Sequence, residues 1–103
     1  MNKLVTYTAR AKMKAMIHSM NSGLSNTKDR CVAMRITSHP KGGFEIEHVF
    51  SGNNKHDIII CNNPCIITDE YTLALLIDGS IDFSYKDDEF IIIRDKNVIL
   101  AHT

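Results

Sequence analysis

Cysteine and histidine are the residue types in this sequence that could bind a metal, and two of the cysteines lie close together. Cys61 and Cys65 flank a polar turn sequence at residues 62–64. Thiolates bind zinc, iron and iron–sulfur clusters, but two ligands are too few for a closed site, and this spacing is a weaker signal than Cys-x2-Cys. Cysteine is often buried, so we interpret both as small core residues beside a hairpin turn. We expect Cys31 in the core as well.

The histidines are scattered along the chain. His39 and His56 lie in predicted turns and could join Cys61, Cys65 or nearby glutamates in a metal site if the fold brought them together. Nothing in their spacing requires such a site. We therefore expect no metal and keep these four residues as ligand candidates under an alternative hypothesis. His48 shares an apolar strand face and is expected to be a hydrogen-bonded core residue.

Arrangements of residues that are typical of enzymes are missing from the sequence. There is no phosphate-binding loop, and Ser22 and Ser25 do not follow a strand, as a nucleophile elbow requires. The acidic run at residues 87–89 is expected to be a solvated turn, and Lys12 and Lys14 the polar face of a helix. We expect a protein that is not an enzyme.

Length and composition exclude several classes of protein. The 103 residues suffice for one domain, residues 1–103, with one hydrophobic core. Twelve basic residues balance twelve acidic ones, which does not favour nucleic acid or an anionic membrane as a partner. No apolar run reaches the roughly 18 residues of a membrane span, and the first residues lack the apolar core of a signal peptide. Three cysteines are an odd number, which argues against a disulfide framework and for a cytosolic protein.

The element that opens the chain is predicted to be a helix over residues 6–20. A threonine at its start can cap it, and Gly23 after its end suits a left-handed cap. One apolar stripe at helical spacing is expected to pack on a sheet, and it consists of Ala9, Met13, Met16, Ile17 and Met20.

Short strands are predicted for most of the remaining chain. Residues 31–37 alternate as a strand, and a turn over 38–44 leads into a second strand, whose apolar face holds His48 and Phe50. The apolar runs 58–61 and 65–67 indicate strands that are buried on both faces.

A short helix is expected to start near Asp69, a cap candidate, and to end before the turn at Asp78-Gly79. Three further strands are predicted at residues 81–85, 89–94 and 98–101. The fold class is mainly β (α+β), with one N-terminal helix and one short internal helix.

Residues 66–83 resemble a segment of the HesB-like domain family, the A-type iron–sulfur cluster carriers. Asp69 stands where the family has an acid after two hydrophobic residues, and Thr72 where it has a serine. Asp78-Gly79 matches the family's Asp-Gly pair, which precedes a strand. The resemblance implies a compact mixed β-sheet folded on itself. Weaker similarity extends over about residues 5–97.

The cysteines that hold the cluster in this family have no counterpart here. Carriers have one cysteine in the glycine-rich turn after the first strand and a Cys-Gly-Cys pair near the C-terminus. In this sequence the turn at 38–44 and the residues after Asn97 contain no cysteine. The resemblance therefore implies a divergent member without a cluster and with no cofactor.

The function that we expect is that of a non-enzymatic accessory protein derived from these carriers. It would act through contacts with a protein partner or a second copy of itself, in iron–sulfur or sulfur metabolism. The alternative is a protein that binds iron or an iron–sulfur cluster through substitute ligands.

The expected contact site consists of the turn at 38–44 and the tail at 101–103, which we predict to lie close together. Changing the charge of Lys41 and removing the tail is expected to leave stability almost unchanged. The residues proposed for contact are His39, Lys41, Gly42, Gly43 and His102.

Overall fold

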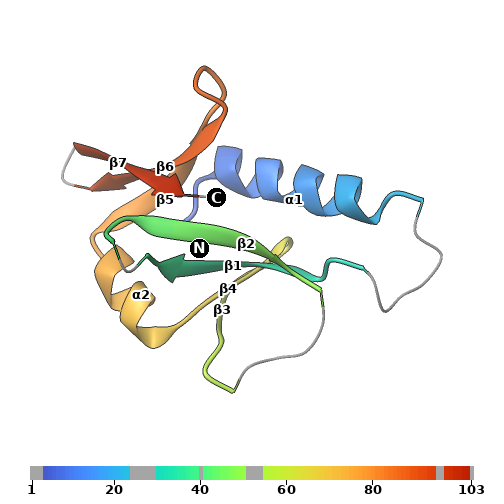
Figure 1. The fold of residues 1–103 in the computed structure, drawn as a ribbon, viewed down its shortest axis with the longest axis horizontal. Coiled ribbons are helices and arrows are strands. Elements are labelled where there is room, and N and C mark those ends of the chain that lie inside the picture. The colour runs from blue at the N-terminus through green and yellow to red at the C-terminus, as the bar shows by residue number, and fades with distance from the viewer. Residues whose placement is uncertain (1–3, 24–29, 40, 51–54, 95–96, 103) are drawn as a thin grey trace.

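The computed structural model describes residues 4–23, 30–39, 41–50, 55–94 and 97–102. They form two helices and seven strands (Figure 1). In chain order these are α1 (Tyr7–Asn21), β1 (Ala33–Ser38), β2 (Phe44–Val49), β3 (Ile58–Asn62), β4 (Cys65–Thr68), α2 (Glu70–Leu76), β5 (Gly79–Ser84), β6 (Glu89–Arg94) and β7 (Asn97–His102). This is a mainly β, α+β fold, as the sequence predicted.

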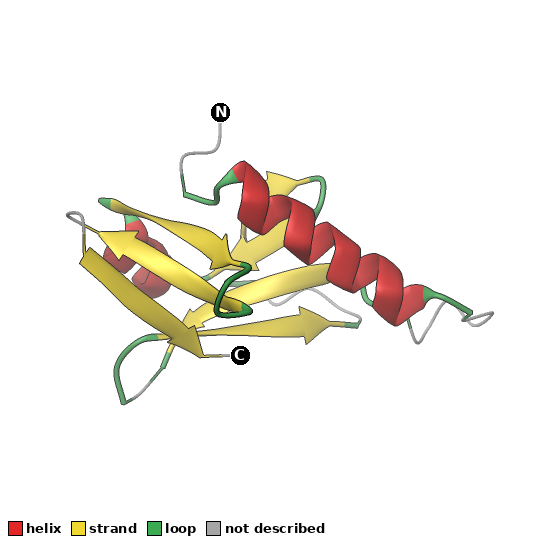
Figure 2. Ribbon diagram, turned by 90° about the horizontal axis from the view of Figure 1, so that it is seen from above, coloured by secondary structure: helices red, strands yellow, loops and turns green. Residues whose placement is uncertain are grey.

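The strands form one mixed sheet in the order β3-β4-β1-β2-β7-β6-β5. Neighbours in the hairpins β1–β2, β3–β4, β5–β6 and β6–β7 are antiparallel, whereas β1–β4 and β2–β7 are parallel. β2 and β7 pair through only two residues each, Phe44 with Ala101 and Glu45 with His102. The sheet therefore has a β1–β4 half and a β5–β7 half that meet at this short pairing (Figures 1 and 2).

Helix α1 packs along the sheet, and its start is fixed by Thr6. The Thr6 hydroxyl oxygen accepts a hydrogen bond from the Ala9 N–H at 3.1 Å and donates one to Asp82 Oδ1 at 2.6 Å. The first residues also join β5, because the Thr6 N–H donates to the Ile81 carbonyl at 2.9 Å. The helix is thereby tied to the β5–β7 half at its first turn.

The apolar stripe of α1 is confirmed except at its last position. Ala9 and Met13 are buried, and Met16 and Ile17 pack against the core. Met20, however, is 42 % exposed, so its predicted place in the stripe is wrong. Met20 lies in the last turn of the helix, which extends past the strands (Figure 2).

The core lies between α1 and one face of the sheet. Its members come from almost every element, and the largest include Phe90, Met13, Met34, Ile66 and Leu76. A second, much smaller cluster lies on the opposite face and consists of Ala33, Val49 and Ile67. Side chains alternate between the two faces along β1 and β4, so consecutive residues of one strand belong to different clusters.

Three expectations about burial are corrected by the structure. β3 is not buried on both faces: it is an edge strand, and Ile59 is 61 % exposed. Phe50 follows β2 and is exposed, and His48 is only partly buried, stacking on Phe50 with ring centroids 6.3 Å apart. β4 and Cys31 are in the interior as predicted. A hydrophobic run alone does not reveal which strand has a neighbour on only one side.

Candidate functional site

The turn between β1 and β2 is held by its own backbone. The His39 N–H donates to the Gly43 carbonyl at 2.9 Å, and the Gly42 N–H donates to the His39 carbonyl at 3.0 Å. Gly42 and Gly43 have φ angles of 94° and 80°, a region in which residues with a Cβ are strained. The Lys41 N–H donates to His39 Nδ1 at 3.1 Å, so the imidazole is part of the turn.

The tail lies beside this turn, as predicted. Ala101 and His102 are the last residues of β7, and they pair in parallel with Phe44 and Glu45, the first residues of β2. We call His39, Lys41, Gly42, Gly43 and His102 the contact edge. Lys41 and Gly42 are exposed, whereas the side chain of His102 lies outside what the structure describes. Because Ala101 and His102 are part of the sheet, we now expect that removing the tail lowers stability.

The two clustered cysteines pack against different hydrophobic clusters. Cys61 pairs with Ile66 and packs on the large core, whereas Cys65 packs on the small cluster on the opposite face. Burial, and then the nearby Cys61 thiol, raise the pKa of Cys65 above its usual value. Thiols bind metals as thiolates, so a raised pKa opposes this role. Both observations fit core residues better than a ligand pair.

The two histidine candidates lie at the other end of the sheet. His39 follows β1 and His56 precedes β3, at the end where Ile36, Thr68 and Ile58 are in register. Cys61 and Cys65 lie at the opposite end of the β3–β4 hairpin. The topology therefore does not bring the four alternative ligands together. Within the described parts of the chain, no three His, Cys, Asp or Glu side chains form a group that could hold a metal ion.

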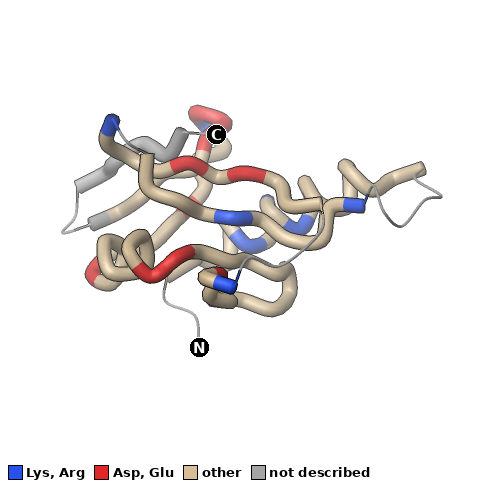
Figure 3. The backbone as a smooth tube through the Cα atoms, turned by 60° about the horizontal axis from the view of Figure 1, so that its bottom comes forward, with Lys and Arg blue, Asp and Glu red and all other residues tan. Residues whose placement is uncertain are grey.

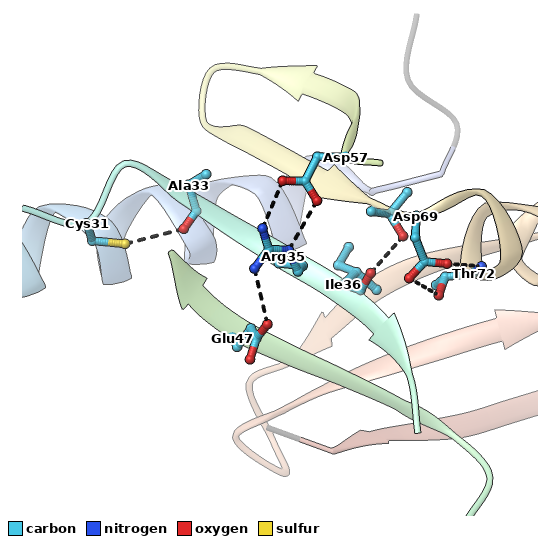
Figure 4. A network of polar contacts seen from close by, with 9 residues as sticks. Cys31, Ala33, Arg35, Ile36, Glu47, Asp57, Asp69 and Thr72 are labelled. Atoms are coloured by element: carbon cyan, nitrogen blue, oxygen red, sulfur yellow. Dashed lines mark hydrogen bonds and ion pairs between the residues drawn. The ribbon is translucent and has the colours of Figure 1, made fainter. Parts of the chain in front are cut away.

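A charged network crosses the face of the sheet that carries the small cluster (Figure 4). Arg35 on β1 donates to both carboxylate oxygens of Asp57, at 2.8 and 3.4 Å, and lies 3.5 Å from Glu47 on β2. The hydrogen bond with Asp57 raises the pKa of Arg35 more than burial lowers it. The Asp57 side chain is only 11 % exposed, so this pair is largely shielded from water.

The start of α2 is tied to the end of β1 by a second set of hydrogen bonds (Figure 4). Asp69 caps the helix, with its carboxylate accepting from the Thr72 N–H at 2.7 Å and from the Thr72 hydroxyl at 3.0 Å. The Thr72 hydroxyl oxygen also accepts from the Ser38 N–H at 3.0 Å. This hydrogen bond holds Ser38, the last residue of β1, directly before His39 of the contact edge.

The sequence analysis did not predict that Arg35 and Asp57 pair. They are 22 residues apart, and β4 lies between β1, which holds Arg35, and β3, which Asp57 precedes. No local spacing could have signalled the contact. The alternation of side chains along the strand does place Arg35 on the sheet face opposite Met34 and Ile36, but it does not indicate which residue Arg35 contacts.

A comparison with protein-family models found no matching family, and a comparison with curated proteins found no matching sequence. In the described residues, neither helix is long and apolar enough to cross a membrane. The β1–β2 hairpin carries both blue and red segments (Figure 3), from Arg35 and Lys41 and from Glu45 and Glu47, which fits the overall balance of charge.

Proposed function

We propose that this protein is a non-enzymatic accessory protein that acts through protein contacts at the contact edge. The observation that carries the proposal is the parallel pairing of Phe44 with Ala101 and of Glu45 with His102. It places the tail, which is far away in the sequence, beside a turn whose residues Lys41 and Gly42 are exposed. Loops on a rigid scaffold are common sites of function, and this turn is anchored to β1, β2 and, through Ser38, α2.

The chemistry of the edge suits a protein partner. Lys41 offers an exposed positive charge, and Glu45 on β2 offers an exposed negative charge close by in sequence and strand order. Gly42 has nothing within 4 Å of the place where a Cβ would lie, so a partner's backbone can approach closely. Mixed charges of this kind give orientation and specificity to a protein contact.

The resemblance of residues 66–83 to HesB-like proteins is the reason for proposing partners in iron–sulfur or sulfur metabolism. The carriers' ligand cysteines are missing from the turn at 38–44 and from the residues after Asn97. We therefore propose a role that requires no bound cluster. The compartment proposed for this role is the cytosol.

A charge reversal at Lys41 tests the contact edge. A partner captured with the purified chain is identified by mass spectrometry, purified, and titrated by calorimetry. We expect Lys41→Glu to weaken the association at least tenfold, because an exposed charge in an interface would then meet a like charge.

Lys86→Glu is the matched control, because it makes the same charge change in the exposed β5–β6 turn. It is expected to leave the affinity unchanged. Equal affinities for the two variants would contradict the contact edge. Failure to capture any specific partner, together with a monomer in light scattering, would contradict the protein-contact function itself.

Anaerobic reconstitution with iron and sulfide tests the alternative, a cluster held by substitute ligands. We expect no stoichiometric cluster, because Cys61 and Cys65 pack on opposite faces and His39 and His56 lie at the other end of the sheet. The measurement is the visible spectrum together with iron and sulfide assays. A stable visible band that disappears in Cys61→Ser or Cys65→Ser would establish the alternative.

A further inference from the structure

A cleft of about 380 Å³ lies where the last turns of α1 meet the start of β1 and the β3–β4 turn. It is at the opposite end of β1 from the contact edge and shares no residue with it. Its volume falls in the lower part of the range for small-molecule sites in proteins, roughly 300–1,000 Å³. The proposed function makes no use of this cleft.

Basic side chains from two segments of the chain converge on the cleft. Lys14 and His18 are four residues apart on α1 and therefore share one side of the helix, and Arg30 faces them from the segment before β1. None of the described residues that line the cleft is acidic. The chain as a whole has no net charge, so this concentration of cations is local.

The rest of the lining supplies hydrogen-bond donors and an apolar floor. The amides of Asn62 and Asn63 come from the β3–β4 turn, opposite the helix. Ile17, Val32 and Pro64 provide apolar surface between the polar groups. An apolar wall with a few converging polar groups is the usual composition of a ligand site.

The cleft is pre-formed by a hydrogen-bonded clasp. The Asn21 amide donates to the Cys31 carbonyl at 2.8 Å, and its oxygen accepts from the Cys31 N–H at 2.6 Å. Cys31 is itself buried, so the clasp fixes the backbone between Arg30 and Val32 against the end of α1. A ligand would not have to order this backbone when it binds, which lowers the cost of binding.

The helix dipole acts against an anion here, because the C-terminal end of α1 carries about half a negative charge. This effect falls off within the last turn. Lys14 lies two turns before the end of the helix, and Arg30 lies outside it. Two full positive charges and one imidazole therefore outweigh the dipole.

We propose that this cleft binds a small organic anion that has a carboxylate or phosphate group and a short apolar portion. The anionic group lies between Lys14 and Arg30, whose guanidinium can donate two parallel hydrogen bonds to either group. The apolar portion lies on Ile17 and Pro64. The inference is independent of the proposed protein contact.

Nuclear magnetic resonance titrations of the full chain at low salt test this site. The probes are benzoate, phenyl phosphate and the uncharged benzyl alcohol. We expect at least one anion to give saturable shifts at Lys14, Arg30 and Asn63, and benzyl alcohol to bind at least tenfold more weakly. The anion that binds more tightly identifies the preferred group, and added salt is expected to weaken its binding.

Arg30→Ala and Lys14→Ala are each expected to weaken binding of the preferred anion at least fivefold. Lys86→Ala removes an exposed lysine far from the cleft and is the matched control. The amide spectrum of each variant reports whether the fold is intact. The proposal is overturned if neither anion gives saturable shifts at the cleft, or if folded Arg30→Ala and Lys14→Ala bind as tightly as the unaltered chain.

Discussion

Among single residues, Arg35 has the clearest tertiary role. Its guanidinium meets two carboxylates of different exposure: Asp57 is 11 % exposed and lies at 2.8 Å, whereas Glu47 is 51 % exposed and lies at 3.5 Å. Water screens an exposed ion pair strongly and a shielded one much less. We therefore expect the contact of Arg35 with Asp57 to contribute to stability and its contact with Glu47 to contribute little.

Asp57→Asn is expected to lower the free energy of unfolding by about 1.5–3 kcal/mol, the usual range for a hydrogen bond to a charged group. Glu47→Gln is the matched control and should cost less than about 1 kcal/mol, as exposed pairs do. Urea denaturation followed by circular dichroism measures both. Equal effects of the two substitutions would show that burial does not distinguish these contacts.

The cysteines illustrate how burial decides the chemistry of a residue. Cys65 packs against Ala33, Val49 and Ile67, and its pKa is raised by this burial. A raised pKa disfavours the thiolate, which is the form that binds metals and acts as a nucleophile. Cys31 donates from its thiol to the Ala33 carbonyl at 3.4 Å and is likewise a core residue.

Among the elements, α2 shows how a seven-residue helix can be stable. A helix of this length is marginal by itself in water, so it depends on its cap and on packing. Asp69 supplies the cap, and the buried side chains of Thr72 and Leu76 attach the helix to the rest of the fold. Tyr71, on the outer side, is exposed.

Leu76→Ala is expected to cost about 2–5 kcal/mol, because Leu76 is 1 % exposed and its removal leaves a cavity in the main core. Tyr71→Ala, five residues earlier on the exposed side of the same helix, should change stability by about 0.5 kcal/mol at most. Thermal and urea unfolding measure the difference. A small effect at Leu76 would mean that the core can close over the lost side chain.

At the scale of the whole molecule, β7 connects the two halves of the sheet. It pairs with β6 over four residue pairs and with β2 over two. Helix α1 also contacts both halves, through β1 and β5, and the segment before it is bridged to β5 by Val5 and Ile81. The relative placement of the halves therefore depends on these contacts and on the shared core under α1.

Removal of residues 101–103 is expected to destabilise the protein by about 1–3 kcal/mol, because it eliminates the pairing of β7 with β2 and each backbone hydrogen bond contributes roughly 0.5–1.5 kcal/mol. Lys41→Glu, in the adjacent turn, should change stability by less than about 0.5 kcal/mol. Urea unfolding of the two variants provides the comparison. An unchanged midpoint after the truncation would show that the β2–β7 pairing contributes nothing to stability.

Much of the local structure could be predicted from the sequence, because it depends on neighbouring residues. Thr6 and Asp69 start the two helices through bonds to residues three positions later. Gly42 and Gly43 permit the left-handed turn, and alternation gives the faces of β1 and β2. The prediction that the turn and the tail lie close together was also confirmed, although it came from the resemblance and not from a local pattern.

The tertiary structure alone decided the properties that depend on residues distant in the sequence. The chain's own pattern determined the elements, the caps and the main core, since these follow from side-chain period and short-range hydrogen bonds. Strand order made β3 an edge, although its sequence is as apolar as that of β4. Long-range packing also paired Arg35 with Asp57 and gathered Lys14 and Arg30 around one cleft. These outcomes arise from which strands become neighbours, and a local sequence pattern carries no information about that choice.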